Sequence, residues 1–277
     1  MLELILNDFT WERPVSPKKG FMWRSWDNER QLIRVPGAEF VSYNPHAGIF
    51  RDFADLKQTP EAVLQFANRY GMLRNRLDFN DFSFWRMGIQ QMSELVPLGD
   101  AIVGDDWKAI PKALEPFIGN PLRDSEYLRP VRAKQERREQ VTRDELAHAA
   151  IMCLYHAISP LHRFEPVASW NSRLGKVELR LKFCDLINFI YYQLGHAVIG
   201  RRKFRQCPIC GKWFVLIPGV NRADRSLCSG YCRLKLSRQR KAAAIKLHNE
   251  GWTPKQIAEQ VDSSVDKVKQ WIGEANA

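Results

Sequence analysis

The sequence predicts a mainly α-helical fold in three parts, with minor β structure in the first part. Apolar residues recur at helical spacing behind helix caps over much of residues 59–198. Two close pairs of cysteines follow at 207–232, and a second run of caps and helical spacing fills the end of the chain. We therefore predict a mainly helical sensor or dimerisation domain at 1–200, a metal-stapled module at 201–240 and a three-helix domain at 241–277.

Composition indicates an ordinary globular protein, long enough for one large core or two domains. Of 277 residues, 45% are hydrophobic and 26% are charged. Every apolar segment is shorter than the roughly 20 residues that a bilayer span needs, so no membrane partner is expected. The first residues lack the basic start and small-residue cleavage site of a secretory signal. We predict a cytoplasmic location, where reducing conditions favour metal over disulfides at paired cysteines.

The net charge of +11 is concentrated in the last part of the chain. Residues 201–277 hold 16 Lys/Arg and 6 Asp/Glu, whereas residues 1–200 hold 26 and 25. If four thiols became thiolates on one Zn²⁺, residues 201–277 would still carry +8. A segment this basic attracts phosphate backbones over about 8–10 Å in physiological salt. The asymmetry favours a nucleic-acid partner over a surface that only keeps the protein soluble.

Short alternating runs predict a little β structure near the N-terminus. Leu2, Leu4 and Leu6 alternate with polar residues, as do residues 31–35 and, more loosely, 39–43. Pro36-Gly37 lies between the latter two runs and is typical of a turn. We therefore expect residues 31–35 and 39–43 to form a hairpin.

Helix signals take over from residue 59. Thr59-Pro60-Glu61 is a cap followed by proline at the first helical position, and Gly71 can end this helix in the left-handed conformation. Thr142 and Glu145 form a capping box that opens another helix. Together with their apolar spacing, these signals predict helices at 59–71, 82–95, 142–158 and 185–198.

Two other segments of the first domain have different patterns. Residues 177–183 alternate apolar and polar side chains, which predicts a strand. Residues 129–145 are highly charged, which indicates an exposed connection or a solvated helix. The aromatic stripes of the predicted helices are interpreted as core.

The sequence gives no sign of a known catalytic machinery. The six histidines show no ligand spacing, and the chain has no P-loop, dinucleotide fingerprint or nucleophile elbow. Cys153 and Cys184 lie in apolar helical contexts and are interpreted as buried thiols. No catalytic residue is predicted, although a nuclease assembled from distant residues stays open.

Four cysteines form the strongest motif in the chain. Two close pairs at this separation can surround one tetrahedral metal ion, which predicts one structural Zn²⁺ held by Cys207, Cys210, Cys228 and Cys232. Four sulfur ligands leave no open position, so we expect no catalysis at this metal. A thioredoxin-like redox pair and a set of unrelated thiols are the competing interpretations, and the presence of a second pair argues against both.

The residues around the cysteines predict the local fold. Gly211 permits the tight turn after the first pair, and residues 212–216 are expected to start a hairpin that turns near Pro218-Gly219 and returns to Cys228. Ser229 can cap a helix whose first turn carries Cys232. A knuckle, a hairpin and a helix around one zinc ion make a treble clef.

These residues carry a family resemblance. Residues 207–214 (CPICGKWF) and 224–233 (DRSLCSGYCR) resemble the CGNR-type treble-clef zinc fingers of bacterial proteins. The resemblance covers about residues 175–241 and also touches 59–71. It implies a mostly helical N-terminal domain before the finger and a role in transcription. In this chain Arg233-Leu234-Lys235 follows Cys232, where the family has Gly-Asn-Arg.

The last 37 residues predict a helix-turn-helix. Residues 241–250 form a first helix, Thr253-Pro254 opens a second, and residues 262–264 turn the chain into a third. In such folds the third helix enters the major groove, and the second touches phosphate. The candidate contacts are therefore Lys267, Lys269 and Gln270 for bases and Thr253, Lys255 and Gln256 for phosphates. A small bundle that binds protein is the alternative.

A basic stretch joins the finger to this domain. It is either one continuous helix from about Ser229 or a flexible arm, and both forms could lie along a phosphate backbone. Its candidate DNA contacts are Arg233, Lys235, Arg238, Arg240 and Lys241.

These features together predict a zinc-containing, sequence-specific DNA-binding protein that regulates transcription and associates with the nucleoid. The expected partners are double-stranded DNA, a second copy in a homodimer, and an effector or protein that binds residues 1–200. Two alternatives stay open: a nucleic-acid-processing enzyme or accessory factor with chemistry in residues 1–200, and an adaptor that binds RNA or protein.

Overall fold

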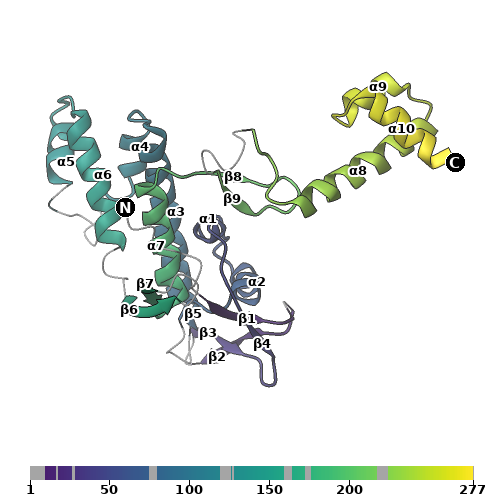
Figure 1. The fold of residues 1–277 in the computed structure, drawn as a ribbon. Helices are drawn as coiled ribbons and strands as arrows, with labels where there is room; N and C mark the ends of the chain where they lie inside the picture. Colours follow the sequence, from purple (N-terminus) through teal and green to yellow (C-terminus); the bar gives the residue numbers. More distant parts are fainter. Residues whose placement is uncertain are drawn as a thin grey trace. The chain divides into compact units, whose positions relative to one another are not determined.

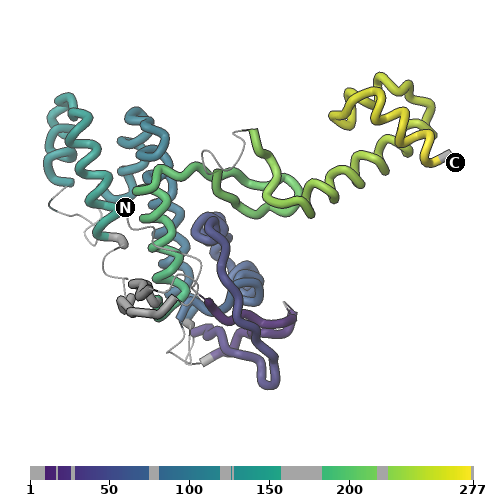
Figure 2. The backbone as a smooth tube through the Cα atoms, in the orientation of Figure 1, coloured from purple at the N-terminus to yellow at the C-terminus, as the bar shows by residue number. Residues whose placement is uncertain are grey.

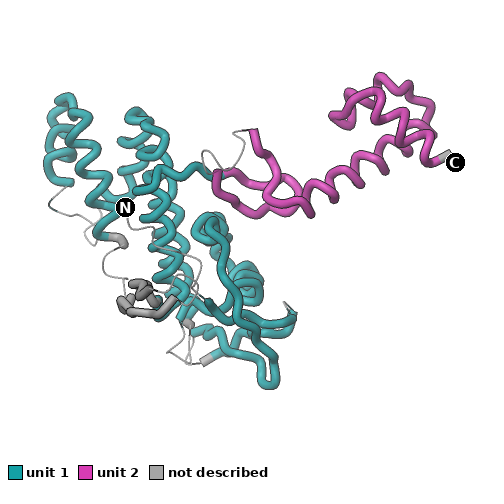
Figure 3. The backbone as a smooth tube through the Cα atoms, in the orientation of Figure 1, with its two compact units in different colours: residues 1–204 teal, residues 205–277 magenta. Residues whose placement is uncertain are grey.

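The computed structural model describes residues 10–16, 18–26, 29–74, 80–118, 126, 128–158, 164–171, 176–216 and 224–276. Helices dominate these residues and the sheets are small antiparallel ones, which confirms the mainly α class (Figure 1). The chain divides into two compact units, residues 1–204 (unit 1) and 205–277 (unit 2), which Figure 3 colours teal and magenta. The predicted strand at residues 2–6 lies outside the described residues.

Two small sheets lie at the start of unit 1. Strand β1 (Trp11–Pro14) pairs with β4 (Phe40–Tyr43), and β3 (Glu29–Arg34) lies between β2 (Phe21–Trp26) and β5 (Asn80–Asp81). The predicted hairpin is therefore wrong: β3 and β4 flank a turn at Pro36-Gly37 but belong to different sheets. Strand β3 pairs with β2 and strand β4 with β1 instead. Both partner strands are rich in aromatic residues, and their side chains Trp11 and Phe21 are buried in the core.

Helices α1 (Ile49–Ala54) and α2 (Pro60–Tyr70) connect these sheets to the core. The Thr59 hydroxyl accepts a hydrogen bond from the Ala62 N–H, so the predicted cap is confirmed. Helix α2 packs against β1 and β2, and the ring of Phe66 lies tilted against that of Phe53 of α1, with centroids 5.4 Å apart. Gly71 ends the helix as expected, but with φ 94° and ψ 177° rather than in the left-handed helical region.

Helix α3 (Phe82–Gly104) is the long element of unit 1 and packs against α1, α4 (Ile110–Leu114), α6 (Arg143–Ile158) and α7 (Leu186–Ile199). It continues nine residues beyond the predicted end and contains Pro97. Proline normally interrupts a helix. Here Leu95, Leu98 and Ala101 are buried on both sides of it, so packing favours continuation.

The remaining elements of unit 1 follow their sequence patterns. The box of Thr142 and Glu145 forms at the start of α6, with reciprocal bonds of 2.9 and 3.3 Å. The charged segment contains α5 (Arg129–Glu136), a solvated helix that buries only Val131 among its residues. The predicted strand and helix appear as β7 (Lys176–Phe183) and α7. Strand β6 (Phe164–Asn171), which pairs with β7, had no prediction.

Unit 2 is built around one long helix. Strand β8 (Lys203–Gln206), which begins in unit 1, pairs with β9 (Trp213–Leu216). Helix α8 (Gly230–Asn249) is followed, after short turns, by α9 (Pro254–Gln260) and α10 (Val265–Asn276). Figure 2 shows α8 as an unbroken helix. The basic stretch is therefore helical. The modules predicted at 201–240 and 241–277 share this helix.

A separate apolar core holds the last three helices together. Ala244 of α8, Ile257 of α9 and Val268 of α10 are fully buried, and Trp271 packs beside them. Thr253 and Gln256 form a capping box at the start of α9. The cap signal at Thr253 and the apolar spacing of the other two segments thus predicted the three helical segments of this region.

Candidate metal centre and nucleic-acid interface

The first cysteine pair lies in a tight turn between β8 and β9. The Cys207 N–H donates to the Lys212 carbonyl at 3.0 Å, and the Gly211 N–H donates to the Cys207 carbonyl at 2.8 Å. Gly211 has φ 69°, which an L side chain rarely adopts. This turn brings β8 beside β9, and the strand that was expected to end at Cys228 is absent from the described residues before it. Residues 224–229 contain no strand, and the expected turn at Pro218-Gly219 lies outside the described residues.

The second cysteine pair flanks the start of α8. Ser229 is the N-cap, and its hydroxyl accepts the Cys232 N–H at 3.3 Å, as the sequence predicts. This cap fixes Cys232 in the first helical turn, where its side chain is buried. The N-terminal end of a helix also favours a thiolate over a thiol.

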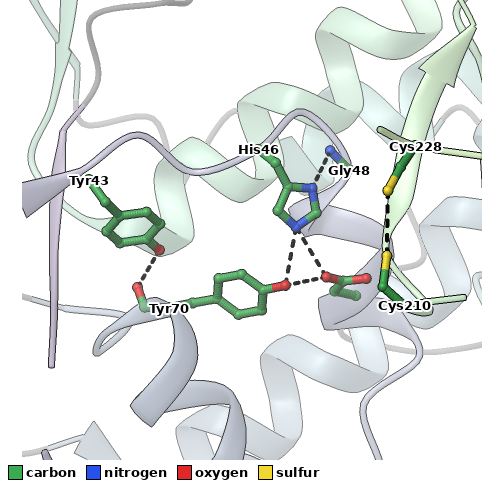
Figure 4. Close-up of polar contacts among 7 residues, drawn as sticks. Tyr43, His46, Gly48, Tyr70, Cys210 and Cys228 are labelled. Atoms are coloured by element: carbon green, nitrogen blue, oxygen red, sulfur yellow. Dashed lines mark hydrogen bonds and ion pairs between the residues drawn. The ribbon is translucent and has the colours of Figure 1, made fainter. Parts of the chain in front are cut away.

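The structure brings all four cysteines together. Their sulfur atoms all lie within 4.8 Å of one another. The Sγ of Cys228 is 3.5 Å from that of Cys210 and 3.5 Å from that of Cys232; Figure 4 shows the first of these contacts. Sulfurs about 2.3 Å from one tetrahedral ion lie roughly 3.8 Å apart. None of the four forms a disulfide. The cluster therefore fits a single metal ion.

The electrostatics of the cluster also favour a cation. Burial acts to raise the pKa of the Cys207 thiol, but backbone hydrogen bonds at Cys228, Ile209 and Cys210 lower it to about 6. Burial, together with the hydrogen bond with Cys210, raises the pKa of Cys228 to about 12. Four negative sulfurs this close repel one another. A divalent cation removes that repulsion and lets all four ionise.

The module around the cluster has almost no apolar core of its own. Among the described residues from 205 to 240, only Cys207 and Cys232 are buried. So small a module rarely folds without a metal ion or another cross-link. We therefore expect the cysteine cluster, with its metal ion, to stabilise this module in place of a hydrophobic core.

Two cations of α8 predicted to contact DNA are engaged within unit 2. Arg240 forms an ion pair with Asp262 in the turn before α10, and Lys241 pairs with Glu274 of α10 at 2.6 Å. Both contacts orient α8 against the last two helices. Exposed pairs of this kind contribute little stability, so either cation could exchange its partner for a phosphate.

The other three predicted cations of α8 are exposed and have no ion-pair partner among the described residues. Arg233 lies about three turns before Ala244 and therefore on the side of α8 that faces α9 and α10. Lys235 and Arg238 lie on the side that faces away from them. The structure thus places the three on different faces of the helix.

The predicted contacts on α9 and α10 lie at the surface. Lys255, Lys267 and Lys269 are exposed and form no ion pair with a described residue. Gln270 is exposed as well and donates to Glu274 at 2.9 Å. Because Lys267 and Gln270 are three residues apart, they share one face of α10.

The two remaining candidates have a structural role. The Gln256 side chain accepts bonds from the Thr253 N–H at 3.0 Å and the Thr253 hydroxyl at 2.8 Å. The same two residues close the capping box of α9. Because these two side chains already bond to each other, a phosphate that binds here would have to contact atoms outside the capping box.

Unit 1 contains a polar cluster that sequence reasoning missed. The Gly48 N–H donates to His46 Nδ1 at 3.2 Å, which places the proton on Nε2, and Nε2 lies 3.1 Å from the Asp52 carboxylate. The Tyr70 hydroxyl donates to the same carboxylate oxygen, and the Tyr43 hydroxyl donates to the Tyr70 carbonyl (Figure 4). Both His46 nitrogens are occupied, so the imidazole holds α1 and α2 together. No local motif signals this cluster.

Acid is expected to weaken unit 1 through Asp52. Burial acts to raise the pKa of this carboxyl, but hydrogen bonds from His46 and Tyr70 outweigh it and hold the pKa below 3.8. The stabilisation is complete above the unfolded pKa and is lost as pH falls through the lower folded value. Asp52→Asn should cost roughly 2–3 kcal/mol at pH 7. Denaturant unfolding followed by hydrogen exchange of peptides from 46–70 measures this.

Two variants control this test. Tyr70→Phe removes one hydrogen-bond donor to Asp52. Like Asp52→Asn, it should make the free energy of unfolding fall less steeply as the pH drops below about 4. Glu61→Gln, at an exposed position of α2, should leave the acid response unchanged. An Asp52→Asn protein with the wild-type acid response would contradict the assignment.

None of the helices in the described part of the chain is both long and apolar enough to cross a bilayer. No family model, curated protein sequence or solved structure matches the chain. The functional argument therefore depends on the site residues themselves.

Proposed function

We propose that this chain is a zinc-containing protein that binds specific DNA sequences and regulates transcription. Cys207, Cys210, Cys228 and Cys232 would hold one structural Zn²⁺ in a treble clef. Helices α8, α9 and α10 would act as a helix-turn-helix. The likeness of the finger to CGNR-type proteins agrees with this role, and unit 1 would bind an effector, a protein partner or a second copy.

The observation that carries the proposal is the exposed cationic surface of a small, separately packed helical bundle. Helix α10 buries Val268 and Trp271 and exposes Lys267, Lys269 and Gln270 on its remaining surface. Lysine can donate to guanine acceptors, and glutamine can pair with adenine. Gly273, with open space around its Cα, lets a duplex approach this helix closely.

The metal module adds a rigid extension to this surface. Helix α8 contains no Asp or Glu between Gly230 and Asn249, and one end holds Cys232 while the other holds Ala244 in the bundle core. Zinc binding would therefore order the cationic helix from its first turn. Among the predicted α8 cations that form no ion pair with a described residue, Arg233 lies on the side that faces α9 and α10, so it is best placed to contact the duplex that α10 would read. Because four sulfurs occupy the metal, its role is structural.

Replacing the base-reading residues should relax sequence preference. Lys267→Ala or Gln270→Ala is expected to cost roughly 1–3 kcal/mol of discrimination between the preferred duplex and its single-base variants. Selection of binding duplexes from a random pool, followed by titration of the selected sequence, measures this. Lys255→Ala should weaken all duplexes equally and reduce the slope of log K against log salt by about 1.

Lys112→Ala, at an exposed position of α4, is the matched control and should change neither quantity. Equal affinity of the wild type for all duplexes, with cleavage on addition of Mg²⁺, would favour a nucleic-acid-processing enzyme. A strong preference for single-stranded RNA would favour the adaptor role. Either result contradicts the proposed regulator.

A further inference from the structure

Arg225 makes an unusual set of contacts beside the cysteine cluster. Its Nε donates to the Leu227 carbonyl at 2.9 Å, and its Nη2 donates to the Cys228 carbonyl. Its guanidinium carbon lies 5.3 Å from the centre of the Phe214 ring on β9. Its own carbonyl accepts a bond from Arg205 Nη1 at 2.8 Å. The side chain is half-buried.

These contacts fix the segment that carries the second cysteine pair. The two carbonyls belong to Cys228 and the residue before it, and the Ser229 cap of α8 follows at once. In a segment without regular strand structure, the guanidinium replaces the backbone pairing that would otherwise orient Cys228. The contact of its guanidinium with the Phe214 ring holds this segment against β9, the strand that follows the first cysteine pair.

The positive charge of Arg225, like its hydrogen bonds, favours the metal-bound form of the cluster. A divalent ion with four thiolates has a net charge of −2, and a cation nearby stabilises it. Groups that orient metal ligands in this way commonly change metal affinity by 10–100-fold when they are removed. Only a planar, forked side chain can bond two carbonyls and also stack on a ring.

We propose that Arg225 is a positioning residue of the metal centre, which aligns Cys228 with the other three sulfurs in the folded module. The inference depends on the proposed zinc site but not on DNA binding. It also takes Arg225 out of the set of cations available to phosphate. Arg205 supports it by holding the Arg225 backbone.

The test compares two substitutions of Arg225 in the full-length protein. Arg225→Lys keeps the charge but loses the fork and the stacking, whereas Arg225→Gln loses both. Competition of the zinc-loaded protein with a chelator is expected to show 10–100-fold weaker zinc binding for both variants. The ligand-field bands of the Co²⁺-substituted protein should shift in Arg225→Lys, because the sulfur tetrahedron is distorted. A residue that only stabilised the fold would leave the spectrum of the loaded site unchanged.

Lys212→Gln provides the control. Lys212 is exposed, lies two residues from Cys210 and has no side-chain partner among the described residues, so its loss removes a nearby charge alone. Its zinc affinity should stay within threefold of the wild type. Arg225→Lys with unchanged affinity and spectrum overturns the inference, as does an equal loss in Lys212→Gln and Arg225→Gln. A wild type that binds no zinc contradicts the proposed metal site itself.

Discussion

Cys210→Ser is expected to unfold the metal module while unit 1 keeps its helices. Cys210 is one of four sulfurs that converge within 4.8 Å. Structural zinc contributes on the order of 10–16 kcal/mol of apparent binding energy to small modules, and that energy is available only to the folded form. Serine offers a poor ligand for this ion. The described part of the module has almost no apolar core that could compensate.

The loss should spread along the chain in a defined way. Residues 205–232 contain the turn, β9 and the cap of α8, which all depend on the cluster for their arrangement. The first two turns of α8 should fray because Ser229 and Cys232 lose their fixed positions. The bundle core of Ala244, Ile257 and Val268 contains no cysteine and should persist.

Hydrogen exchange resolved by peptide, together with metal analysis, measures this outcome. The wild type should contain one zinc per chain and show protection at 205–240, and Cys210→Ser should lose both. Cys184→Ser is the matched control, because Cys184 lies outside the cluster in unit 1. Full protection at 205–240 in Cys210→Ser without metal would contradict the structural role.

The features that the sequence predicted correctly depend on near neighbours in the chain. Caps such as Thr59 and Thr253 act within three residues, and their hydrogen bonds form as expected. The two cysteine pairs are also local, since each pair is closed by one turn. From the sequence we infer that the two pairs lie close together, because one tetrahedral metal ion requires four ligands around it.

The features that were missed depend on contacts between distant segments. The pairing of β3 with β2 and of β4 with β1 is decided by which apolar faces bury Trp11 and Phe21, and alternation alone does not name a partner. The cluster of His46, Asp52 and Tyr70 gathers residues from three separate segments of unit 1. From the sequence alone Arg225 cannot be distinguished from other surface cations, because its role depends on its bonds to the Leu227 and Cys228 carbonyls.

Gly71→Ala is expected to be among the most destabilising single changes in unit 1. Gly71 has φ 94° and ψ 177°, a conformation that is essentially restricted to glycine. A Cβ here would lie 2.3 Å from the Glu12 carbonyl oxygen and 2.6 Å from Nε1 of Trp11. Neither can move freely, because Glu12 belongs to β1 and the Trp11 indole donates to the Met72 carbonyl at 3.1 Å.

Backbone strain and the forced displacement of β1 together should cost about 2–6 kcal/mol. Denaturant unfolding monitored by hydrogen exchange in peptides from 11–14 and 60–72 measures the change. Gly37→Ala separates the two causes, since Gly37 has φ 76° but its Cβ would meet no atom within 4 Å. It should lose only about 1–2 kcal/mol. Equal losses in the two variants would show that the packing of α2 against β1 tolerates a methyl group at Gly71.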